Sequence, residues 1–218
     1  MATMEVKKRV KNAVLYTNGC IRIDNVRGSY VHADKPYKGK NKRDDGKDAE
    51  PKFSIVGIMS KDTHSEAKDL IIERINEILK DNKDAKVPKD KRFIKNGDDA
   101  EKDEYVNAWT ISASEINAPK CRERSGELID RADGGERIRE LFKSGYWFNI
   151  LIRPWYQDND YGKRVNAGLV GVQFVKKDQT FGEGEIDESD AWEAVEGDDG
   201  MGSGSSKSSS TADDDDGL

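Results

Sequence analysis

Apolar and polar residues alternate in several short runs between residues 10 and 176, and this pattern predicts β-strands. The alternation is clearest in residues 145–153, where Tyr146, Phe148, Ile150 and Ile152 share one strand face. Pro154 has no backbone N–H, so it is expected to end this strand. The runs predicted to be strands lie at residues 10–23, 53–59, 105–114, 145–153 and 165–176.

One segment has helical rather than strand periodicity. Thr63 and Glu66 match the T-x-x-E capping box with which many helices begin, and the helix is expected to end near residues 80–83. Its apolar residues recur every three or four positions and therefore define one buried face. These residues are Leu70, Ile71, Ile75, Ile78 and Leu79.

The five strands and the helix together predict a mainly β fold with one long helix. The first strand is expected to be bent or bulged at Gly19, and residues 24–52 have so little apolar periodicity that they are expected to form a long loop. Five strands and one helix are the parts expected of the OB-fold, a five-stranded, partly open barrel that binds oligonucleotides. Another α+β sheet is the alternative that this pattern leaves open.

Opposite charges gather in two parts of the chain. Residues 183–218 contain thirteen acidic residues and one lysine, a net charge of −12, whereas residues 1–182 have a net charge of +6. Such an asymmetry is typical of nucleic-acid-binding proteins, and the Gly/Ser-rich residues 201–212 behave as a flexible coil. We therefore expect an OB-fold domain at residues 1–182 and a flexible acidic tail at 183–218. A tail that only improves solubility is the alternative.

Several classes of protein are not supported by the sequence. It has no apolar run long enough for a membrane span, and Cys20 and Cys121 are expected to be reduced thiols of a cytosolic protein. No phosphate-binding loop, nucleophile motif or zinc-ligand spacing is present, so we expect no enzyme, no cofactor and no metal. A cluster of carboxylates at residues 98–104 could belong to a metal-dependent nuclease, although a solvated loop explains it better.

Binding of single-stranded DNA is the function that the pattern favours. Such binding needs a cationic groove for phosphates and aromatic faces on which bases stack. Basic residues and tyrosines are interleaved between positions 30 and 52, and Trp147 is expected to share a strand face with Arg153. Core packing is an equally good explanation for Trp109 and Trp147. The candidate DNA-binding residues are Tyr30, Lys35, Tyr37, Lys38, Lys40, Lys42, Arg43, Trp109, Trp147, Arg153, Trp155, Tyr156, Tyr161, Lys163 and Arg164.

Several short motifs, taken in order, resemble a family of bacteriophage single-stranded DNA-binding proteins first catalogued as a domain of unknown function. The resemblance covers residues 12–193 and rests on the order and spacing of the motifs rather than on any one of them. The motifs are Gly28–Tyr30, Lys35–Tyr37, Asn96–Asp98, Ser144–Asn149, Trp155-Tyr156, Tyr161-Gly162, Gly168–Gln173, Phe181-Gly182 and Ala191-Trp192.

The resemblance implies an OB-fold protein that coats single-stranded DNA during phage replication, recombination or repair, in the cytoplasm of the infected bacterial host. It also implies an acidic C-terminal tail that competes with DNA and recruits phage or host proteins of replication and recombination. The tail residues expected to do so are Asp213, Asp214, Asp215, Asp216 and Leu218. Comparable tails often end in an aromatic residue, so Leu218 leaves the docking mode open.

Three other functions stay open at this point. The acidic tail could belong to a phage protein-interaction module or an inhibitor that mimics DNA, the carboxylate cluster to a nuclease, and the basic body to a duplex-specific binder. No membrane partner is expected. A homodimer is possible, because OB-type binders often pair or assemble along the strand.

Overall fold

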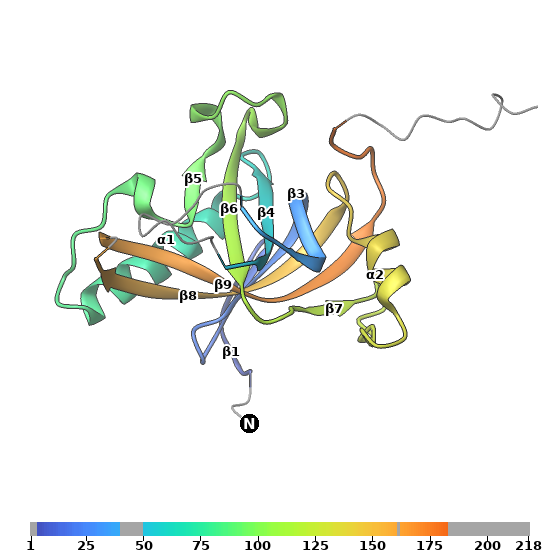
Figure 1. Ribbon diagram of the computed structural model, residues 1–218. Helices are drawn as coiled ribbons and strands as arrows, with labels where there is room; N and C mark the ends of the chain where they lie inside the picture. The colour runs from blue at the N-terminus through green and yellow to red at the C-terminus, as the bar shows by residue number, and fades with distance from the viewer. Residues whose placement is uncertain (1–3, 40–49, 161, 183–218) are drawn as a thin grey trace, which may run out of the picture. The chain divides into compact units, whose positions relative to one another are not determined.

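The computed structural model describes residues 4–39, 50–160 and 162–182. All strands of these residues belong to one sheet, in the order β5-β6-β4-β3-β8-β9-β7, with the β1–β2 hairpin joined to β3 (Figure 1). All pairings are antiparallel except that of β7 with β9. The strands are β1 (Val6–Val10), β2 (Ala13–Tyr16), β3 (Ile21–Tyr37), β4 (Lys52–Ser60), β5 (Ile94–Asn96), β6 (Ala108–Glu115), β7 (Lys120–Arg122), β8 (Trp147–Asn159) and β9 (Gly162–Lys176).

Two α-helices and three short 3₁₀ turns complete the described fold. Helix α1 (Ser65–Asp81) packs against β1, β2 and β8, and α2 (Gly135–Leu141) packs against β3. The 3₁₀ turns η1 (Lys89–Lys91), η2 (Gly97–Asp99) and η3 (Asp103–Tyr105) lie in the connections around β5. None of the helices in these residues is long and apolar enough to cross a membrane.

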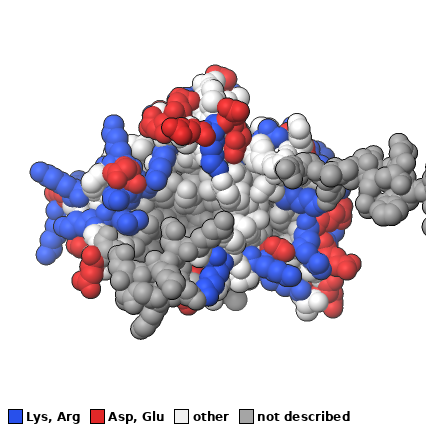
Figure 2. Space-filling view, turned by 45° about the horizontal axis from the view of Figure 1, so that its top comes forward, with Lys and Arg blue, Asp and Glu red and all other residues white. Residues whose placement is uncertain are grey.

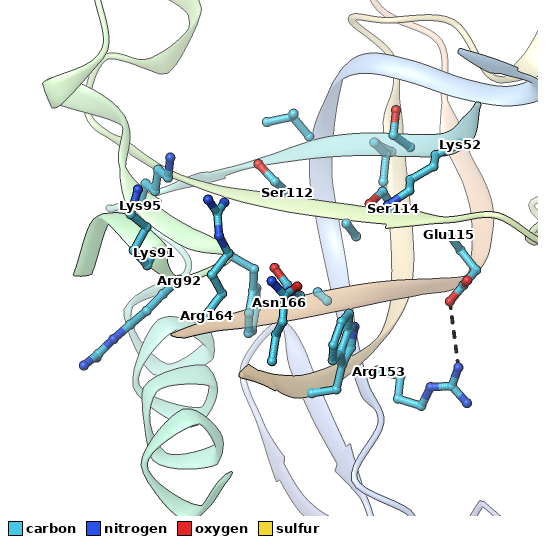
Figure 3. A pocket seen from close by; sticks show the side chains of 18 of the residues that line it. Lys52, Lys91, Arg92, Lys95, Ser112, Ser114, Glu115, Arg153, Arg164 and Asn166 are labelled. Carbon is cyan, nitrogen blue, oxygen red and sulfur yellow. Dashed lines mark hydrogen bonds and ion pairs between the residues drawn. The ribbon is translucent and has the colours of Figure 1, made fainter. Parts of the chain in front are cut away.

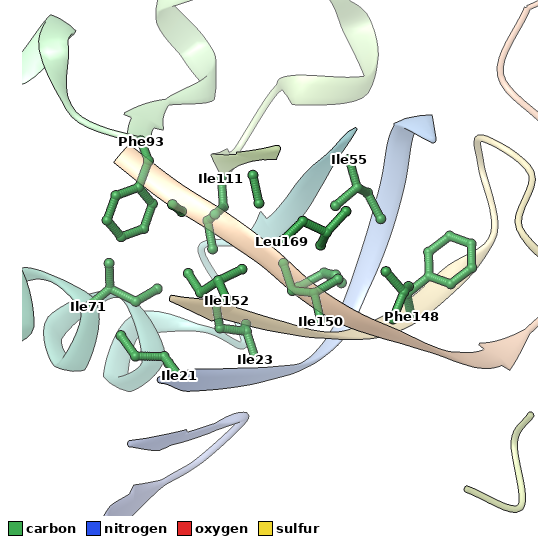
Figure 4. Packing of buried hydrophobic residues seen from close by; sticks show 14 of the residues in the cluster. Ile21, Ile23, Ile55, Ile71, Phe93, Ile111, Phe148, Ile150, Ile152 and Leu169 are labelled. Atoms are coloured by element: carbon green, nitrogen blue, oxygen red, sulfur yellow. The ribbon is translucent and has the colours of Figure 1, made fainter. Parts of the chain in front are cut away.

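The main hydrophobic core lies where the buried faces of the strands meet α1 (Figure 4). Ile21 and Ile23 of β3 pair across the strands with Ile152 and Ile150 of β8, and all four side chains are completely buried. Directly paired β-branched side chains stabilise a sheet by packing against each other and against the layer above. This row of isoleucines holds β3 and β8 together at the centre of the sheet.

The structure confirms a mainly β fold, but it shows neither a single helix nor a five-stranded barrel. The sheet has nine strands, and no ladder among the described residues joins its edge strands β5 and β7. A second helix, α2, also forms where none is predicted. Four strands are additional: β5 and β7 form where no strand is predicted, and two more arise because residues 10–23 belong to three strands rather than one. The structure also differs from the predicted pattern in two segments near the N-terminus.

The first of these segments is residues 10–23, for which a single bent strand is the wrong prediction. Sharp turns at Asn12 and Gly19, with φ of 60° and 80°, divide the segment into the ends of β1 and β3 with all of β2 between them. Both residue types adopt left-handed backbone more readily than others do. The chain therefore reverses twice where the prediction has one bend.

The second segment is residues 24–37, which continue β3 and do not form the predicted loop. Their buried residues include Gly28, Ser29 and Ala33, which are small or polar and give no apolar signal. Two residues with left-handed backbone, Asn25 and Tyr30, lie at register shifts that interrupt the strand's alternation. Bulges of this kind interrupt the alternation of buried and exposed residues by which a strand is recognised in a sequence.

The predicted end of β8 at Pro154 is also wrong, because the strand continues to Asn159. The last residue of β8 that pairs with β3 is Ile152, so Pro154 lies in a stretch where only β9 is a neighbour. A missing N–H removes no hydrogen bond to β3 at that position. Proline is therefore tolerated within the strand.

Helix α1 has the predicted apolar face and ends within the predicted range, but it begins differently. The five predicted residues are all buried, together with Ala67. The helix starts at Ser65, and no side chain caps it. The carboxylate of Glu66 instead accepts a hydrogen bond from the backbone N–H of Lys11, at 3.2 Å, so the capping box does not form.

Candidate nucleic-acid interface

A cationic groove of about 990 Å³ lies over the outer face of β4 and β6, and we refer to it as the groove. Two acidic side chains, Asp90 and Glu115, also line it. Figure 3 shows that the basic residues come from several elements around one opening. They are Lys52, Lys91, Arg92, Lys95, Arg153 and Arg164.

The floor of the groove consists of small side chains. Ser112 and Ser114 are exposed on β6, whereas Ile111 and Ala113, which alternate with them, point into the core. Ser114 pairs with Ser54 of β4. Small hydroxyl side chains leave space above the sheet and can donate or accept hydrogen bonds, so the sheet itself forms a shallow polar bed.

One wall of the groove is the outer part of the β8–β9 hairpin. Trp155 is 46% exposed and faces the groove, and its cross-strand partner is Asn166. Arg153, farther along β8, lies 3.8 Å from the carboxylate of Glu115 and is otherwise exposed. An exposed indole beside guanidinium groups is the combination that binds a base together with its phosphate.

Arg164 of β9 differs from the other cations of this wall. Its Nε atom is buried and has no hydrogen-bond partner among the described residues. A buried N–H group without a partner costs free energy unless a ligand or water satisfies it. Because Arg164 also lines the groove, an anion bound there can pair with its guanidinium group.

The opposite wall is the segment that leads into β5. The guanidinium of Arg92 donates two hydrogen bonds to the carbonyl of Val87, and the N–H of Phe93 donates to the carbonyl of Val165, at 2.9 Å. Lys95 is exposed and pairs with Thr110 of β6. These backbone contacts bring the cations of residues 89–95 to the same opening as Arg164.

A second hollow, which we call the side hollow, adjoins the groove and has a volume of about 1,280 Å³. Val56, Arg92, Lys95 and Ser112 line both, so the two are continuous. The aromatic residues of the side hollow are Tyr30, Tyr105 and Trp109.

Lysines lie over all three of these rings. The Nζ of Lys102 lies 4.2 Å from the ring centre of Tyr30 and 5.4 Å from that of Tyr105. The ammonium groups of Lys61 and Lys68 lie within 6 Å of the Trp109 ring. A cation above a ring face is attracted by the electrons of the ring. The side hollow is thus aromatic, and five basic residues outnumber the two acidic residues, Asp90 and Asp99, in its lining.

Acidic side chains gather away from the groove, over the segment between β5 and β6 (Figure 2). Asp98 accepts hydrogen bonds from the side chain of Lys61 and from the backbone N–H of Asn107, and these contacts hold its pKa below the ordinary value. Asp99 accepts a hydrogen bond from Asn96. In the described part of the chain, no group of acidic, histidine or cysteine side chains has the geometry of a metal site.

The structure brings together only some of the predicted DNA-binding residues. Arg153, Trp155 and Arg164 line the groove, and Tyr30 and Trp109 line the side hollow. Trp109 is half-buried and also packs against the main core, so both interpretations of this residue describe part of its environment.

The remaining candidates lie elsewhere. Trp147 donates a hydrogen bond from Nε1 to Asp178, at 2.6 Å, and Tyr156 packs against the core. Tyr37 stacks on His32 with ring centres 4.6 Å apart. Lys35, Lys38 and Lys163 are exposed but line neither hollow. The candidates that fall outside the described residues are Lys40, Lys42, Arg43, Tyr161, Asp213, Asp214, Asp215, Asp216 and Leu218.

The sequence analysis misses the cations of the wall before β5. Lys91, Arg92 and Lys95 lie in a connection without strong periodicity, so no predicted element places them near the other candidates. The available signal is the segment KDKRFIK at residues 89–95, where four basic residues surround a phenylalanine. Interleaved basic and aromatic residues are typical of nucleic-acid-binding surfaces.

Comparison with known proteins places the chain in a family. The family described as "Enterobacter phage Enc34, ssDNA-binding protein" matches residues 20–201. The solved structure of the single-stranded DNA-binding protein from bacteriophage Enc34 is 40% identical, with a TM-score of 0.73, over 88% of this chain and 100% of that one. Its complex with single-stranded DNA is also 40% identical, with a TM-score of 0.75, over 84% of this chain and 100% of that one.

No curated protein sequence matches the chain. The family match nevertheless covers well over half of the residues, and the solved structures cover most of the described fold. The resemblance noted from the sequence motifs is thereby confirmed. This chain belongs to the family of the Enc34 phage single-stranded DNA-binding protein.

Proposed function

We propose that this protein binds single-stranded DNA in the groove, without strong sequence preference and without catalysis. The observation that carries the proposal is the exposed indole of Trp155 beside six basic side chains, above a floor of small residues. The solved complex of the Enc34 relative with single-stranded DNA supports the same ligand. We also propose that the nine-stranded sheet is an OB-type fold to which strands have been added.

The groove residues have separable roles in this proposal. Arg164, Arg92 and Lys91 neutralise phosphates, and the released counterions drive association, so affinity falls as salt rises. A base stacks on Trp155, which stabilises binding by roughly 1–3 kcal/mol whatever the base. The serine hydroxyls of the floor can rotate to donate or accept. None of these interactions depends on a particular base, which explains weak sequence preference.

The family match also supports a proposal for the cellular role. Phage proteins that coat single strands protect them during replication, recombination or repair, and we propose such a role in the cytoplasm of the infected host. A groove that binds any sequence suits this task, because exposed strands of every sequence must be covered.

A titration with oligo-dT tests the proposal. Tryptophan fluorescence of the full chain should fall on binding, and log affinity should decrease linearly with log salt. Arg164→Gln should weaken binding about tenfold, the value of one charge-assisted hydrogen bond, and lower the salt slope by about 0.7. Arg137→Gln is the matched control. Arg137 lies on α2, forms ion pairs with Glu123 and Glu140, and lines neither hollow.

The outcomes separate the alternatives. No binding of oligo-dT would reject the proposal and favour a protein-interaction module that acts through its acidic tail. Tighter binding of duplex than of oligo-dT would favour a duplex-specific protein. Degradation of the oligonucleotide with magnesium would indicate a nuclease.

We also propose that residues 1–182 form the DNA-binding domain and that residues 183–218 act as an acidic tail. The tail's net charge of −12 opposes the +6 of the remaining residues, which supports competition between tail and DNA for the groove. We propose that Asp213–Asp216 and Leu218 bind partner proteins when DNA displaces them. Truncation after Gly182 should tighten oligo-dT binding at low salt, and unchanged or weaker binding would reject the competition.

A further inference from the structure

Tyr30 occupies a bulge in β3 at the edge of the side hollow. Ser29 pairs with Val56 of β4, and the next pair is His32 with Ser54, so β3 has one residue more than its partner between these pairs. A bulge of this kind turns a side chain away from the direction that regular alternation would give it. The extra residue lies at Tyr30 or Val31, and Tyr30 has the unusual backbone.

The conformation of Tyr30 is strained, and its ring is exposed. Its φ is 48°, in the left-handed region that a bulky residue rarely adopts, and 52% of its surface is accessible. Strained residues cluster at sites where the side chain has a role that outweighs the local cost. Burial does not explain the strain, since Tyr30 contributes nothing to either hydrophobic cluster of buried residues.

The neighbours of Tyr30 hold it in position. Its hydroxyl accepts a hydrogen bond from Lys102, whose ammonium also lies over the ring. The hydroxyl of the buried Tyr105 lies within hydrogen-bonding distance of Ser29, at 3.2 Å, and fixes the bulge from below. The ring of Tyr30 is therefore presented at the surface by a fixed backbone, with a single lysine at its hydroxyl end.

A continuous row of residues leads from the groove to Tyr30. Ser112 of β6 pairs with Val56 of β4, and Val56 pairs with Ser29, the residue before Tyr30. Adjacent strands lie about 4.8 Å apart, so this row spans roughly 10 Å. Arg92 and Lys95 line both hollows beside it. A single DNA strand bound in the groove can therefore pass these two cations and enter the side hollow.

We propose that the side hollow is a second subsite for the same DNA strand, in which Tyr30 stacks on a base and Lys102 moves from the ring to a phosphate. This inference rests on the proposed binding of single-stranded DNA and adds a second stacking position to it. Lys102 lies 4.0 Å from Glu104, an ion pair at the limit of contact, so little holds the ammonium apart from the tyrosine. When DNA binds, a phosphate can replace Tyr30 as the partner of the Lys102 ammonium, and a base can stack on the ring of Tyr30.

The two subsites fill in a definite order. The groove presents an exposed indole and the cationic side chain of Arg164, whereas the hydroxyl of Tyr30 must first lose its hydrogen bond from Lys102. Short oligonucleotides therefore bind in the groove alone. Only longer ones extend past Arg92 and Lys95 and gain the stacking on Tyr30.

Oligo-dT titrations at two lengths test the proposal with the full chain. Lengths of about 5 and about 15 nucleotides lie near the lower and upper ends of the range of site sizes of OB-type domains. Tyr30→Leu should weaken binding of the longer oligonucleotide about five- to tenfold and that of the shorter one less than about twofold. Tyr37→Leu is the matched control, because Tyr37 is similarly exposed on the same strand but lines neither hollow, and it should change neither affinity.

A second variant separates binding from folding. Tyr30→Gly removes the ring but suits a left-handed backbone, so its melting temperature should equal or exceed that of the wild type while long-oligonucleotide affinity falls. Equal losses at both lengths, or no loss at either, would overturn the second subsite. If the wild type fails to bind the short oligonucleotide, the groove proposal fails instead, and that result is distinct from a Tyr30 effect.

Discussion

Trp147 and Trp155 stand on the same strand and the same strand face, yet their surroundings are opposite. Trp147 lies near the start of β8, where its N–H donates to Asp178 and the ammonium of Lys176 lies 4.8 Å from its ring centre. Trp155 lies near the other end of β8 and is open to the groove. The strand alternation places both rings outside the core, but it does not determine what covers them.

The covering segment explains the difference. Residues 177–182 follow β9 and cross the start of β8, held there by backbone contacts. Arg27 donates hydrogen bonds to the carbonyls of Gly145 and Gln179, and the N–H of Phe181 donates to the carbonyl of Ser144. A ring that would otherwise be open is thereby engaged by the protein itself. An aromatic residue on an outer strand face is available for a ligand only where no other segment crosses it.

The largest expected effect comes from loosening this cover. Gly145 has φ of 101°, and a Cβ there would lie 2.2 Å from the carbonyl oxygen of Gln179. Gly145→Ala should therefore destabilise the fold by about 2–3 kcal/mol, because the left-handed backbone alone costs about 1–2 kcal/mol and the segment must also move. Denaturant unfolding measures the loss, and the emission of Trp147 should shift to the red.

Gly126→Ala is the control for this variant. Gly126 has a similar φ of 90°, and a Cβ there would meet only the end of one flexible side chain, at 3.9 Å. Gly126→Ala should therefore lower stability only by the cost of a left-handed backbone at alanine, about 1–2 kcal/mol. If the two variants lose equal stability, contact with residues 179–181 does not constrain Gly145.

The next effect compares the two tryptophans directly. Trp155→Leu should weaken oligo-dT binding by about 1–3 kcal/mol and leave the melting temperature almost unchanged, since the ring is exposed. Trp147→Leu should do the reverse, because it removes a hydrogen bond and a cation–ring contact but no groove residue. Fluorescence titration and thermal unfolding of both variants give the comparison. Similar affinities for the two variants would contradict the distinction between a covered and an open ring.

The smallest effect concerns the carboxylate that holds Trp147. The N–H groups of Trp147 and then of Gln179 hold the pKa of Asp178 below its ordinary value. The folded state thus binds fewer protons than the unfolded state, so this group stabilises the fold above the ordinary aspartate pKa, and the gain is lost as pH falls through the lower, folded value. Asp178→Asn should lower stability at pH 7 by a few tenths of a kcal/mol, because the carboxylate is well exposed and screened.

Thermal unfolding at several pH values provides the measurement. The wild type and Asp178→Asn should differ at neutral pH and converge as the pH falls through the lowered pKa of Asp178, below which the aspartate is protonated in both states. A difference that grows in acid would mean that the contact with Trp147 does not depend on the charge.

The parts of the fold that could be predicted from sequence are those with regular periodicity. The apolar face of α1 and the alternation of β8 around Ile150 both match the structure, because each is long and buried on one side. The hidden elements are those whose buried residues are small or polar. Gly28 and Ser29 in β3 carry no hydrophobic signal, yet both are buried beneath other elements. Only tertiary packing distinguishes such a strand from a loop.

The site was predictable in its chemistry more than in its geometry. Aromatic and basic residues indicate the ligand class, and three of them, Arg153, Trp155 and Arg164, meet in the groove. Arg92 lies beside them because the backbone N–H of Phe93 donates a hydrogen bond to the carbonyl of Val165 in β9, and these two segments are far apart in the sequence. Trp147 is not part of the groove for a similar reason, because Asp178 in the segment that follows β9 accepts the hydrogen bond of its indole.

Pro154 has a consequence for how copies of this protein coexist. From Arg153 onward β8 has β9 on one side and no described strand on the other, so it forms an open sheet edge. Open edges invite another chain to add its own strand, and natural proteins discourage this with proline and charged residues. The missing donor at Pro154 and the exposed charge of Arg153 make the edge a poor template. This edge of the sheet is therefore a poor place for a second copy of the chain to add a strand.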